Sequence, residues 1–200
     1  MTVLKKSFYS RDTLTIAREL LGQKLVRIVD GQRLSAVVAE TEAYLGAGDS
    51  ASHASRGRTP RNQVMFGPAG IAYVYFVYGM HYMLNVVTEE KGTPGAVLLR
   101  AVVPLEGMAH MQKLRNRQGK NLANGPAKLC QALAIDTAFN GWDLTRGKML
   151  WFEAYRDIPD SGVRAGPRIG IGYAAAADRK ALWRLVVKPE FRNDQTPSNS

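Results

Sequence analysis

The sequence predicts a protein of mixed α/β (α+β) class in which helices flank a mostly antiparallel β-sheet. Short β-rich runs follow one another, separated by Gly, Pro or Asp-Gly, as is typical of antiparallel strands. Segments with a helical spacing of apolar residues interrupt these runs. The chain has 200 residues with 46% hydrophobic content, which suits one core, and no repeat or linker divides it. We therefore expect a single domain over 1–191 and a disordered polar tail over 192–200.

The first expected elements are a short helix and a β-hairpin. Apolar residues recur at helical spacing after Asp12 or Thr13, and Gly22 supplies the stop. Two β-rich runs follow, at 24–29 and 33–44. They are joined by Asp30-Gly31, a dipeptide suited to the positive φ angles of a tight hairpin turn.

The stretch 46–68 is rich in Gly, Ser, Arg and Pro and predicts a long loop. Long loops inside compact domains usually carry function. Further β-rich runs then predict an antiparallel meander, at 71–78, 82–87 and 96–103. Helices are expected at 105–114 and 126–134, and later strands at 149–153, 168–172 and 182–187.

The charge balance points to a polyanionic partner. Lys and Arg number 27 against 17 Asp and Glu, which gives a formal net charge of +10. The single cysteine, Cys130, excludes an intramolecular disulfide and a cysteine-based zinc cluster. No apolar stretch is long enough for a signal peptide or a membrane span. We expect a monomer in the bacterial cytoplasm, associated with the nucleoid and without a membrane partner.

Acidic side chains and a phenol alternate along the run 37–44. In a strand, Glu40, Glu42 and Tyr44 would share one face. From this segment alone, a solvated face or an ion pair with nearby arginines explains the pattern. The loop that follows carries donors suited to phosphate oxygens and base edges, namely His53, Arg56, Arg58, Arg61 and Asn62.

The run 73–82 contains five aromatic residues in ten. A core strand explains only part of this set, because tyrosine hydroxyls need partners or water when they are buried. Aromatic faces also stack on extruded nucleobases. Strand alternation places Tyr73 and Tyr75 on one face and Tyr78, beside the turn at Gly79, on the other.

These segments together resemble the alkyladenine (3-methyladenine) DNA glycosylase family of vertebrates and many bacteria, in a short bacterial form. They stand in the family's order and span most of the chain, from about 20 to 172. The matching segments are Glu40-Thr41-Glu42-Ala43-Tyr44-Leu45-Gly46, Thr59-Pro60-Arg61-Asn62, Tyr73-Val74-Tyr75, Tyr78-Gly79-Met80, Asn85, Leu98-Leu99-Arg100-Ala101, Pro104-Leu105-Glu106-Gly107, Gly125-Pro126 and Lys128-Leu129-Cys130-Gln131-Ala132-Leu133.

The resemblance implies a monofunctional base-excision repair enzyme that acts on double-stranded DNA containing alkylated or deaminated purines. It also implies the single-domain architecture with a curved sheet. Glu42, and not Glu40, is then the general base that activates water, and Arg100 helps to hold that water and a backbone phosphate. The reaction needs no metal, no cofactor and no amine nucleophile, so the abasic site is left uncleaved.

The same resemblance implies how DNA is held. Tyr44 and Tyr75 sandwich the flipped base, His53 supplies hydrogen bonds, and Tyr78 fills the gap left in the duplex. Asn85 crowds the purine 2-amino group and so rejects normal guanine. From the residues themselves, apart from the resemblance, we expect Arg61 and Lys128 to contact the DNA backbone, Lys128 from a helix that opens at 125–126; a plain capped helix also explains that segment.

Simpler explanations of these residues remain open from the sequence. Asn85 could merely satisfy backbone groups, Arg100 could pair with a carboxylate, and a lone histidine such as His53 is more often structural than catalytic. The chain could also be a non-catalytic basic module that binds nucleic acid. Glu42 decides between these functions, because a carboxylate in a phosphate-attracting cleft lowers the affinity of a pure binder. A metal-dependent nuclease is disfavoured, because the histidines at 53, 81 and 110 lack a ligand spacing.

Overall fold

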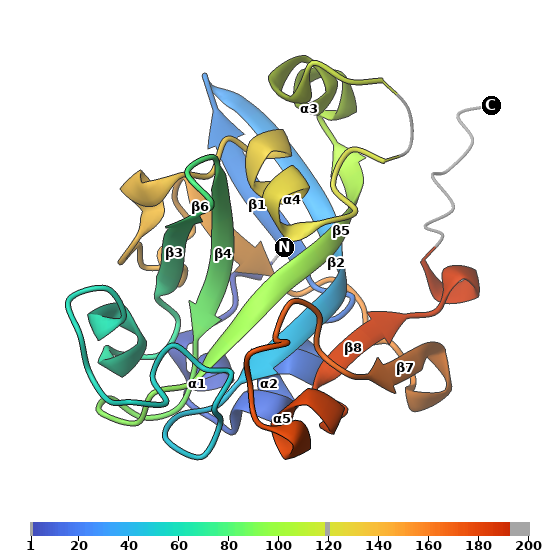
Figure 1. Cartoon of the computed structure of the whole chain (residues 1–200). Helices are drawn as coiled ribbons and strands as arrows, with labels where there is room; N and C mark the ends of the chain where they lie inside the picture. The colour runs from blue at the N-terminus through green and yellow to red at the C-terminus, as the bar shows by residue number, and fades with distance from the viewer. Residues whose placement is uncertain (1, 119–120, 193–200) are drawn as a thin grey trace.

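The computed structural model of the chain describes residues 2–118 and 121–192, and a β-sheet runs through it (Figure 1). The strand order is β3-β4-β5-β2-β1-β6, with β8 pairing β2 and β7 pairing β8. Every described pairing is antiparallel, so the predicted α+β class with an antiparallel sheet is confirmed. The strands are β1 (Lys24–Val29), β2 (Gln32–Tyr44), β3 (Ala72–Val77), β4 (His81–Val87), β5 (Ala96–Glu106), β6 (Leu150–Glu153), β7 (Val163–Gly166) and β8 (Arg184–Val187).

The long strand β2 gives the sheet its curl. Along one edge its first half pairs with β1 and its second half with β8, while β5 runs along the other edge. The register against β5 shifts between Val38 and Thr41. An extra residue of this kind bends a strand and re-aims its side chains. The bend therefore falls immediately before Glu42.

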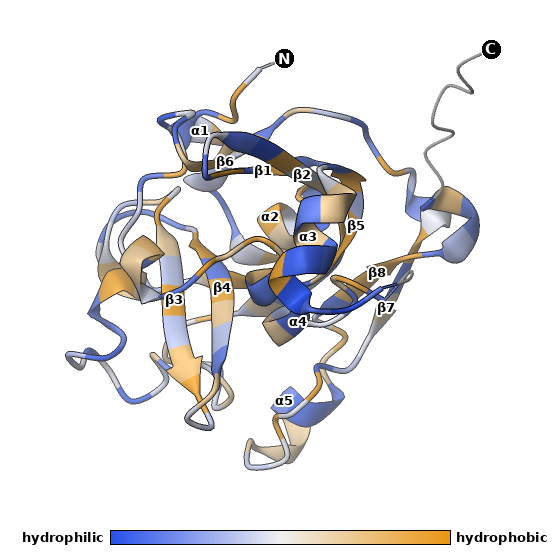
Figure 2. Ribbon diagram, turned by 90° about the horizontal axis from the view of Figure 1, so that it is seen from above, coloured by the Kyte–Doolittle hydropathy of each residue, from blue (hydrophilic) through white to orange (hydrophobic). Residues whose placement is uncertain are grey.

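The helices at 13–19 and 126–132 lie inside this curve (Figure 2). The helices are α1 (Lys6–Tyr9), α2 (Thr13–Glu19), α3 (Met108–Arg115), α4 (Pro126–Ala132) and α5 (Ala176–Lys180), with short 3-10 turns η1 (Gln63–Phe66), η2 (Thr137–Phe139), η3 (Asp160–Gly162) and η4 (Pro189–Phe191). Asp12 caps α2 by accepting a hydrogen bond from the Thr15 N–H, as its position predicts. Apolar residues of α2 and α4, including Ile16 and Leu129, are buried in the main core against the strands.

The hairpin and the meander confirm the sequence prediction. Asp30 and Gly31 have φ angles of 48° and 75°, and Val29 pairs with Gln32 across this two-residue turn. The strands β3, β4 and β5 follow one another as antiparallel neighbours. The predicted helix at 105–114 begins later, at Met108, because β5 continues to Glu106 and Gly107 turns the chain with a φ of 75°.

The predicted strand at 168–172 is wrong. Arg168 turns inward to a buried carboxylate and Gly170 has a φ of 82°, so this segment is an irregular loop. The strand lies earlier, at β7, and ends before Pro167, which cannot donate to a ladder.

Of the expected tail, 193–200 lies outside the described residues. Arg192 itself is held, since its Nε donates to the Val187 carbonyl at 2.7 Å. Arg192 therefore does not belong to a disordered segment. Within the described part of the chain, no helix has both the length and the apolar character to cross a membrane.

Candidate active site

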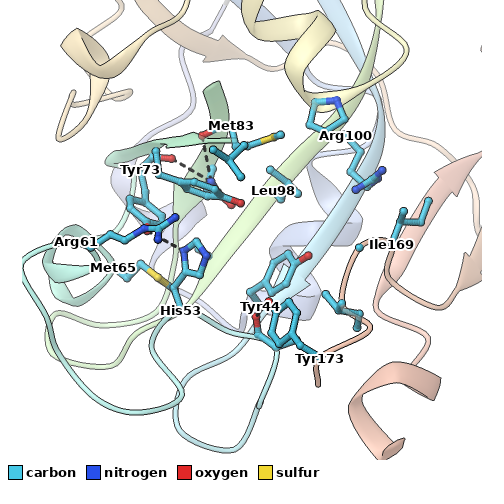
Figure 3. Close-up of a pocket in the computed structure, with 18 of the residues that line it drawn as sticks. Tyr44, His53, Arg61, Met65, Tyr73, Met83, Leu98, Arg100, Ile169 and Tyr173 are labelled. Carbon is cyan, nitrogen blue, oxygen red and sulfur yellow. Dashed lines mark hydrogen bonds between the residues drawn. The ribbon is translucent and has the colours of Figure 1, made fainter. Parts of the chain in front are cut away.

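A cavity of about 310 Å³ opens between the β3–β4 hairpin and the loop that precedes α5. Strands β2, β3, β4 and β5 contribute side chains to it, as do the long loop 46–68 and the loop 167–175 (Figure 3). Figure 3 shows His53 and Tyr73 on one side, Ile169 and Tyr173 on the other, and Tyr44 between them. The cavity lies within the size range of pockets that enclose small ligands.

Glu42 lies fully buried directly behind the lining of this cavity. The Tyr44 hydroxyl donates to its Oε2 at 2.8 Å, and the Ile169 backbone N–H donates to its Oε1 at 2.7 Å. Arg100 Nη1 lies 3.4 Å from the same Oε1. Tyr44, Arg100 and Ile169 all line the cavity, so a single layer of residues separates the carboxylate from it.

Burial raises the pKa of Glu42, and the Arg100 charge and the hydrogen bonds from Ile169 and Tyr44 oppose that rise. Desolvation destabilises the ionised form, whereas a cation or an N–H donor stabilises it. A carboxylate held in this way is a stronger base than an exposed one. Such environments are typical of groups that accept a proton near neutral pH.

Glu40, two residues earlier, has a different environment. Arg100 Nε lies 3.2 Å from its Oε1, and Arg184 Nη1 lies 3.1 Å from the same atom. The explanation of an ion pair with arginines therefore fits Glu40. Arg100 reaches both acids, as expected for two residues on one strand face.

Across the cavity from Glu42 and Arg100 lie three aromatic side chains, His53, Tyr73 and Tyr75, which form an aromatic wall. The ring centroids of His53 and Tyr75 lie 4.6 Å apart, and those of Tyr73 and Tyr75 lie 5.4 Å apart. The Tyr73 hydroxyl and His53 Nδ1 share a hydrogen bond of 2.9 Å. The Arg61 guanidinium carbon lies 5.7 Å from the centre of the Tyr75 ring, so the predicted backbone-contacting arginine lies at this wall.

The groups of the aromatic wall are neutral at physiological pH. Desolvation by burial lowers the pKa of His53, and the Arg61 charge adds to this effect. Burial raises the pKa of Tyr73 to about 12 and raises the pKa of Tyr75 as well. The three rings can therefore offer stacking faces and hydrogen bonds while neutral, and Arg61 is the charged group beside them.

Asn85 lies inside β4 and not at a strand end, with 4% of its surface exposed. Its Nδ2 donates to the Tyr73 carbonyl at 3.1 Å and to the Met83 carbonyl at 3.4 Å. The side chain thus satisfies backbone groups and also lines the cavity. These contacts fix its orientation.

Tyr78 lies in the β3–β4 turn itself. The strand ends at Val77, and Tyr78 and Gly79 have positive φ angles of 54° and 68°. Strand alternation therefore does not apply to Tyr78, and its predicted placement on the opposite strand face is wrong. Its ring is 82% exposed at the mouth of the cavity and stands at the tip of a hairpin that projects from the sheet.

Two further residues that the sequence predicted to contact DNA do not line the cavity. Lys128, on the first turn of α4, donates to the Asn124 side chain at 2.9 Å and does not line the cavity. Asn62, which the sequence grouped with DNA-facing donors, is 1% exposed. Its amide closes the loop by donating to the carbonyls of His53 and Gly57, so it shapes the loop from within.

Sequence reasoning missed the loop 167–175. Ile169 contributes a backbone N–H, for which no side chain gives a signal. Tyr173 is 71% exposed, and its hydroxyl donates to the Ala51 carbonyl. In the part of the chain that the structure describes, no group of three or more His, Cys, Asp or Glu is arranged to hold a metal ion.

Comparison with known proteins identifies what this chain is similar to. Residues 7–190 match the sequence model of the family described as methylpurine-DNA glycosylase. A Clostridium perfringens protein is 45% identical over 196 residues, covering 92% of this chain and 95% of its own. Proteins of Methanocella arvoryzae (46% over 190 residues; 94% of each chain) and Chlorobaculum parvum (49% over 189 residues; 94% and 88%) are also similar. All three carry the name "Putative 3-methyladenine DNA glycosylase".

Proposed function

Since the chain belongs to the methylpurine-DNA glycosylase family, we propose that Glu42 activates the water that releases a damaged purine from DNA. Membership makes the chain a DNA glycosylase, a hydrolase of N-glycosyl bonds in a DNA repair pathway. One observation carries the assignment to Glu42. It is a buried carboxylate, and its Tyr44, Arg100 and Ile169 partners line a cavity with an aromatic wall.

The chemistry follows from a purine swung out of the duplex into this cavity. Water attacks C1′ of the sugar, the bond from C1′ to N9 breaks, and the proton of the water passes to Glu42. A cationic alkylated purine leaves as a neutral base with the electron pair of the broken bond, whereas a neutral purine such as hypoxanthine leaves as an anion that takes a proton from solvent. The carboxylate also stabilises the positive charge that develops on the sugar, and Arg100 orients the water and a backbone phosphate.

Selection begins before the chemical step. Damaged or mismatched pairs cost less to open, so they enter the cavity more readily. Tyr44 and Tyr75 stack on the base, which favours electron-poor alkylated purines, and His53 supplies hydrogen bonds. Asn85, with its amide nitrogen fixed on backbone carbonyls, excludes the 2-amino group of guanine. Deaminated purines such as hypoxanthine, which lack that group, belong to the substrate range.

Contacts outside the cavity hold the duplex. The exposed Tyr78 ring at the tip of the hairpin occupies the gap left by the flipped base, as wedge residues do. Arg61 at the rim and Lys128 on α4 contact phosphates, whose neutralisation releases counterions and makes binding salt-dependent. The enzyme acts as a monomer on double-stranded DNA.

The product is an abasic site without strand cleavage. A lyase step needs an amine that forms a Schiff base with the sugar. Among the described residues that line the cavity, there is no lysine. A reaction in which water is the nucleophile is compatible with these lining residues.

The test is base release by Glu42→Gln under single-turnover conditions. The substrates are duplex DNA methylated in vitro and a duplex with one hypoxanthine. We expect release to fall roughly 10²- to 10⁴-fold, the usual contribution of a general base, while binding to a duplex with an abasic-site analogue is kept. Glu153→Gln is the matched control, because Glu153 is a buried carboxylate outside the cavity. Retained turnover by Glu42→Gln removes Glu42 from the mechanism, and absence of turnover by the wild type points to a binding module.

A further inference from the structure

A buried ion pair lies behind the cavity, outside its lining. Arg168 Nη1 donates to Asp49 Oδ2 at 2.6 Å, and Nη2 donates to Asp49 Oδ1 at 2.8 Å. Both side chains are fully buried. Asp49 belongs to the loop after β2 and Arg168 to the loop 167–175, so the pair joins two segments that are far apart in the sequence.

The pair contacts several groups around the end of β2. Arg168 Nη1 also donates to the Ala43 carbonyl at 2.9 Å. Its guanidinium carbon lies 4.8 Å from the Tyr44 ring centre and 4.7 Å from that of Trp183. The Tyr44 ring is thus backed by Arg168 on a side away from the cavity. Asp49 in turn accepts from two backbone N–H groups, those of Leu45 and Ala51.

Ile169 directly follows Arg168, and its N–H donates to Glu42 Oε1. No helix or strand holds this N–H, because 167–175 is irregular. The nearest anchored group is the side chain of the preceding residue, Arg168, which is held by its ion pair with Asp49. We propose that Arg168 and Asp49 are positioning residues, whose ion pair holds the Ile169 N–H on Glu42 and the Tyr44 ring against the cavity in the geometry that base release requires. This inference rests on the proposed role of Glu42 and extends it.

Fold stability alone is a weak explanation of such a pair. Taking two charges out of water costs about as much as their attraction returns, and apolar side chains of similar volume often serve as well. A bidentate guanidinium–carboxylate contact does fix direction, because the planar fork allows one arrangement. That property suits an anchor for the backbone of a catalytic loop.

The charged and titratable groups that face Glu42 come from several elements. Arg100 lies on β5, Glu40 and Tyr44 on β2, Tyr75 on β3, and Arg168 on the loop. Arg184 on β8 is paired with Glu40. The double variant removes one positive and one negative charge together, so the change expected at Glu42 is the loosening of the Ile169 N–H, whose hydrogen bond favours ionised Glu42. The pH below which activity falls should therefore move upward when the pair is removed.

The experiment replaces the pair by two amides, Asp49→Asn with Arg168→Gln, in the full-length protein. Base release from duplex DNA methylated in vitro is followed under single-turnover conditions across a range of pH. We expect a rate roughly 10- to 100-fold lower at neutral pH, the usual cost of a small misplacement, and an acid limb at higher pH than in the wild type. The matched control is the double variant Arg33→Gln with Glu153→Gln. It removes another ion pair, in which Arg33 at the start of β2 lies 2.8 Å from Glu153 on β6.

A purely structural pair would lower the melting temperature and leave the rate and the acid limb of the folded protein unchanged, and that result would overturn the inference. Arg168→Lys serves if the double variant does not fold. It keeps the charge but cannot form the two-pronged contact, so a reduced rate is expected and a rate equal to the wild type refutes the positioning role. These outcomes are separate from the proposed function, which fails only if Glu42→Gln keeps its turnover or the wild type has none.

Discussion

The aromatic wall of the cavity comes from the long loop and the β3–β4 hairpin that follows it, whereas the wall around Glu42, called the charged wall below, joins three segments. His53, Tyr73 and Tyr75 are neutral and contact one another. Glu42, in contrast, is a buried acid whose contacts come from β2, β5 and the loop 167–175. In the proposed mechanism the aromatic rings bind the base through stacking faces and hydrogen bonds, and the charged wall acts on the glycosidic bond with a buried acid that is held in place at a cost in stability. Binding and chemistry should therefore separate between the two walls.

The largest effect is expected on the charged wall, with Arg100→Met. Base release under single-turnover conditions should fall roughly 10²- to 10³-fold, as for the loss of one preorganised electrostatic group. The Arg100 charge lowers the pKa of Glu42, so its removal should also shift the acid limb of the pH–rate profile upward. Arg33→Met is the matched control, because Arg33 likewise contacts two carboxylates, Glu106 and Glu153, outside the cavity. A loss of binding with no loss of saturated rate would contradict the division between the walls.

The second effect is expected on the aromatic wall, with Tyr75→Leu measured in the Glu42→Gln background. The Kd for a duplex with one hypoxanthine should rise roughly 5- to 150-fold, which corresponds to about 1–3 kcal/mol of stacking per base. Tyr155→Leu, an exposed tyrosine outside the cavity, should leave the Kd unchanged. If Tyr75→Leu instead keeps the Kd in that background and, with Glu42 restored, lowers the rate at saturating enzyme, the aromatic wall takes part in the chemistry and the comparison fails.

These walls also differ in how well the sequence predicts them. The hairpin, the meander and the alternation of Glu40, Glu42 and Tyr44 are local patterns, and local turn chemistry and strand period determine them. The aromatic run is visible for the same reason. The side-by-side arrangement of β3, β4 and β5, which all contribute to the cavity, follows from antiparallel neighbours in sequence order.

The charged wall is less visible, because its partners meet only after folding. The pairing of β8 with β2 is a long-range contact without a sequence signature, and it brings the loop 167–175 to Glu42. The run at 168–172 alternates like a strand, but a buried ion pair and Gly170 override that tendency. A resemblance to a family names Glu42 and Arg100, yet it does not predict the contacts that set their properties.

A smaller effect is expected for Tyr78→Ser, which tests the rim between the walls. Apparent affinity for lesion DNA should fall roughly 3- to 10-fold, because a small side chain cannot fill the gap in the duplex, while the rate at saturating enzyme changes less. Tyr78→Leu should retain most of the affinity, since it restores apolar bulk in the same turn. An equal loss of saturated rate in both variants would show that Tyr78 serves the chemical step.

The smallest effect is on stability and concerns Glu42→Gln. Because burial raises the pKa of Glu42, the folded state binds a proton more readily than the unfolded state does, so this group makes the wild type less stable as pH rises from the ordinary glutamate value through the folded pKa. The cost is about 1.4 kcal/mol for each unit of that rise.

The amide oxygen of the substituted side chain can still accept from the Ile169 N–H without a charge, so the variant should melt a few degrees higher than the wild type at neutral pH, at about 2–4 °C per kcal/mol. In strongly acidic solution, where Glu42 is protonated in both states, the difference should vanish. Thermal melts at both pH values check this, and a variant that is less stable at neutral pH would mean that ionised Glu42 stabilises the fold and that the charged wall carries no such cost.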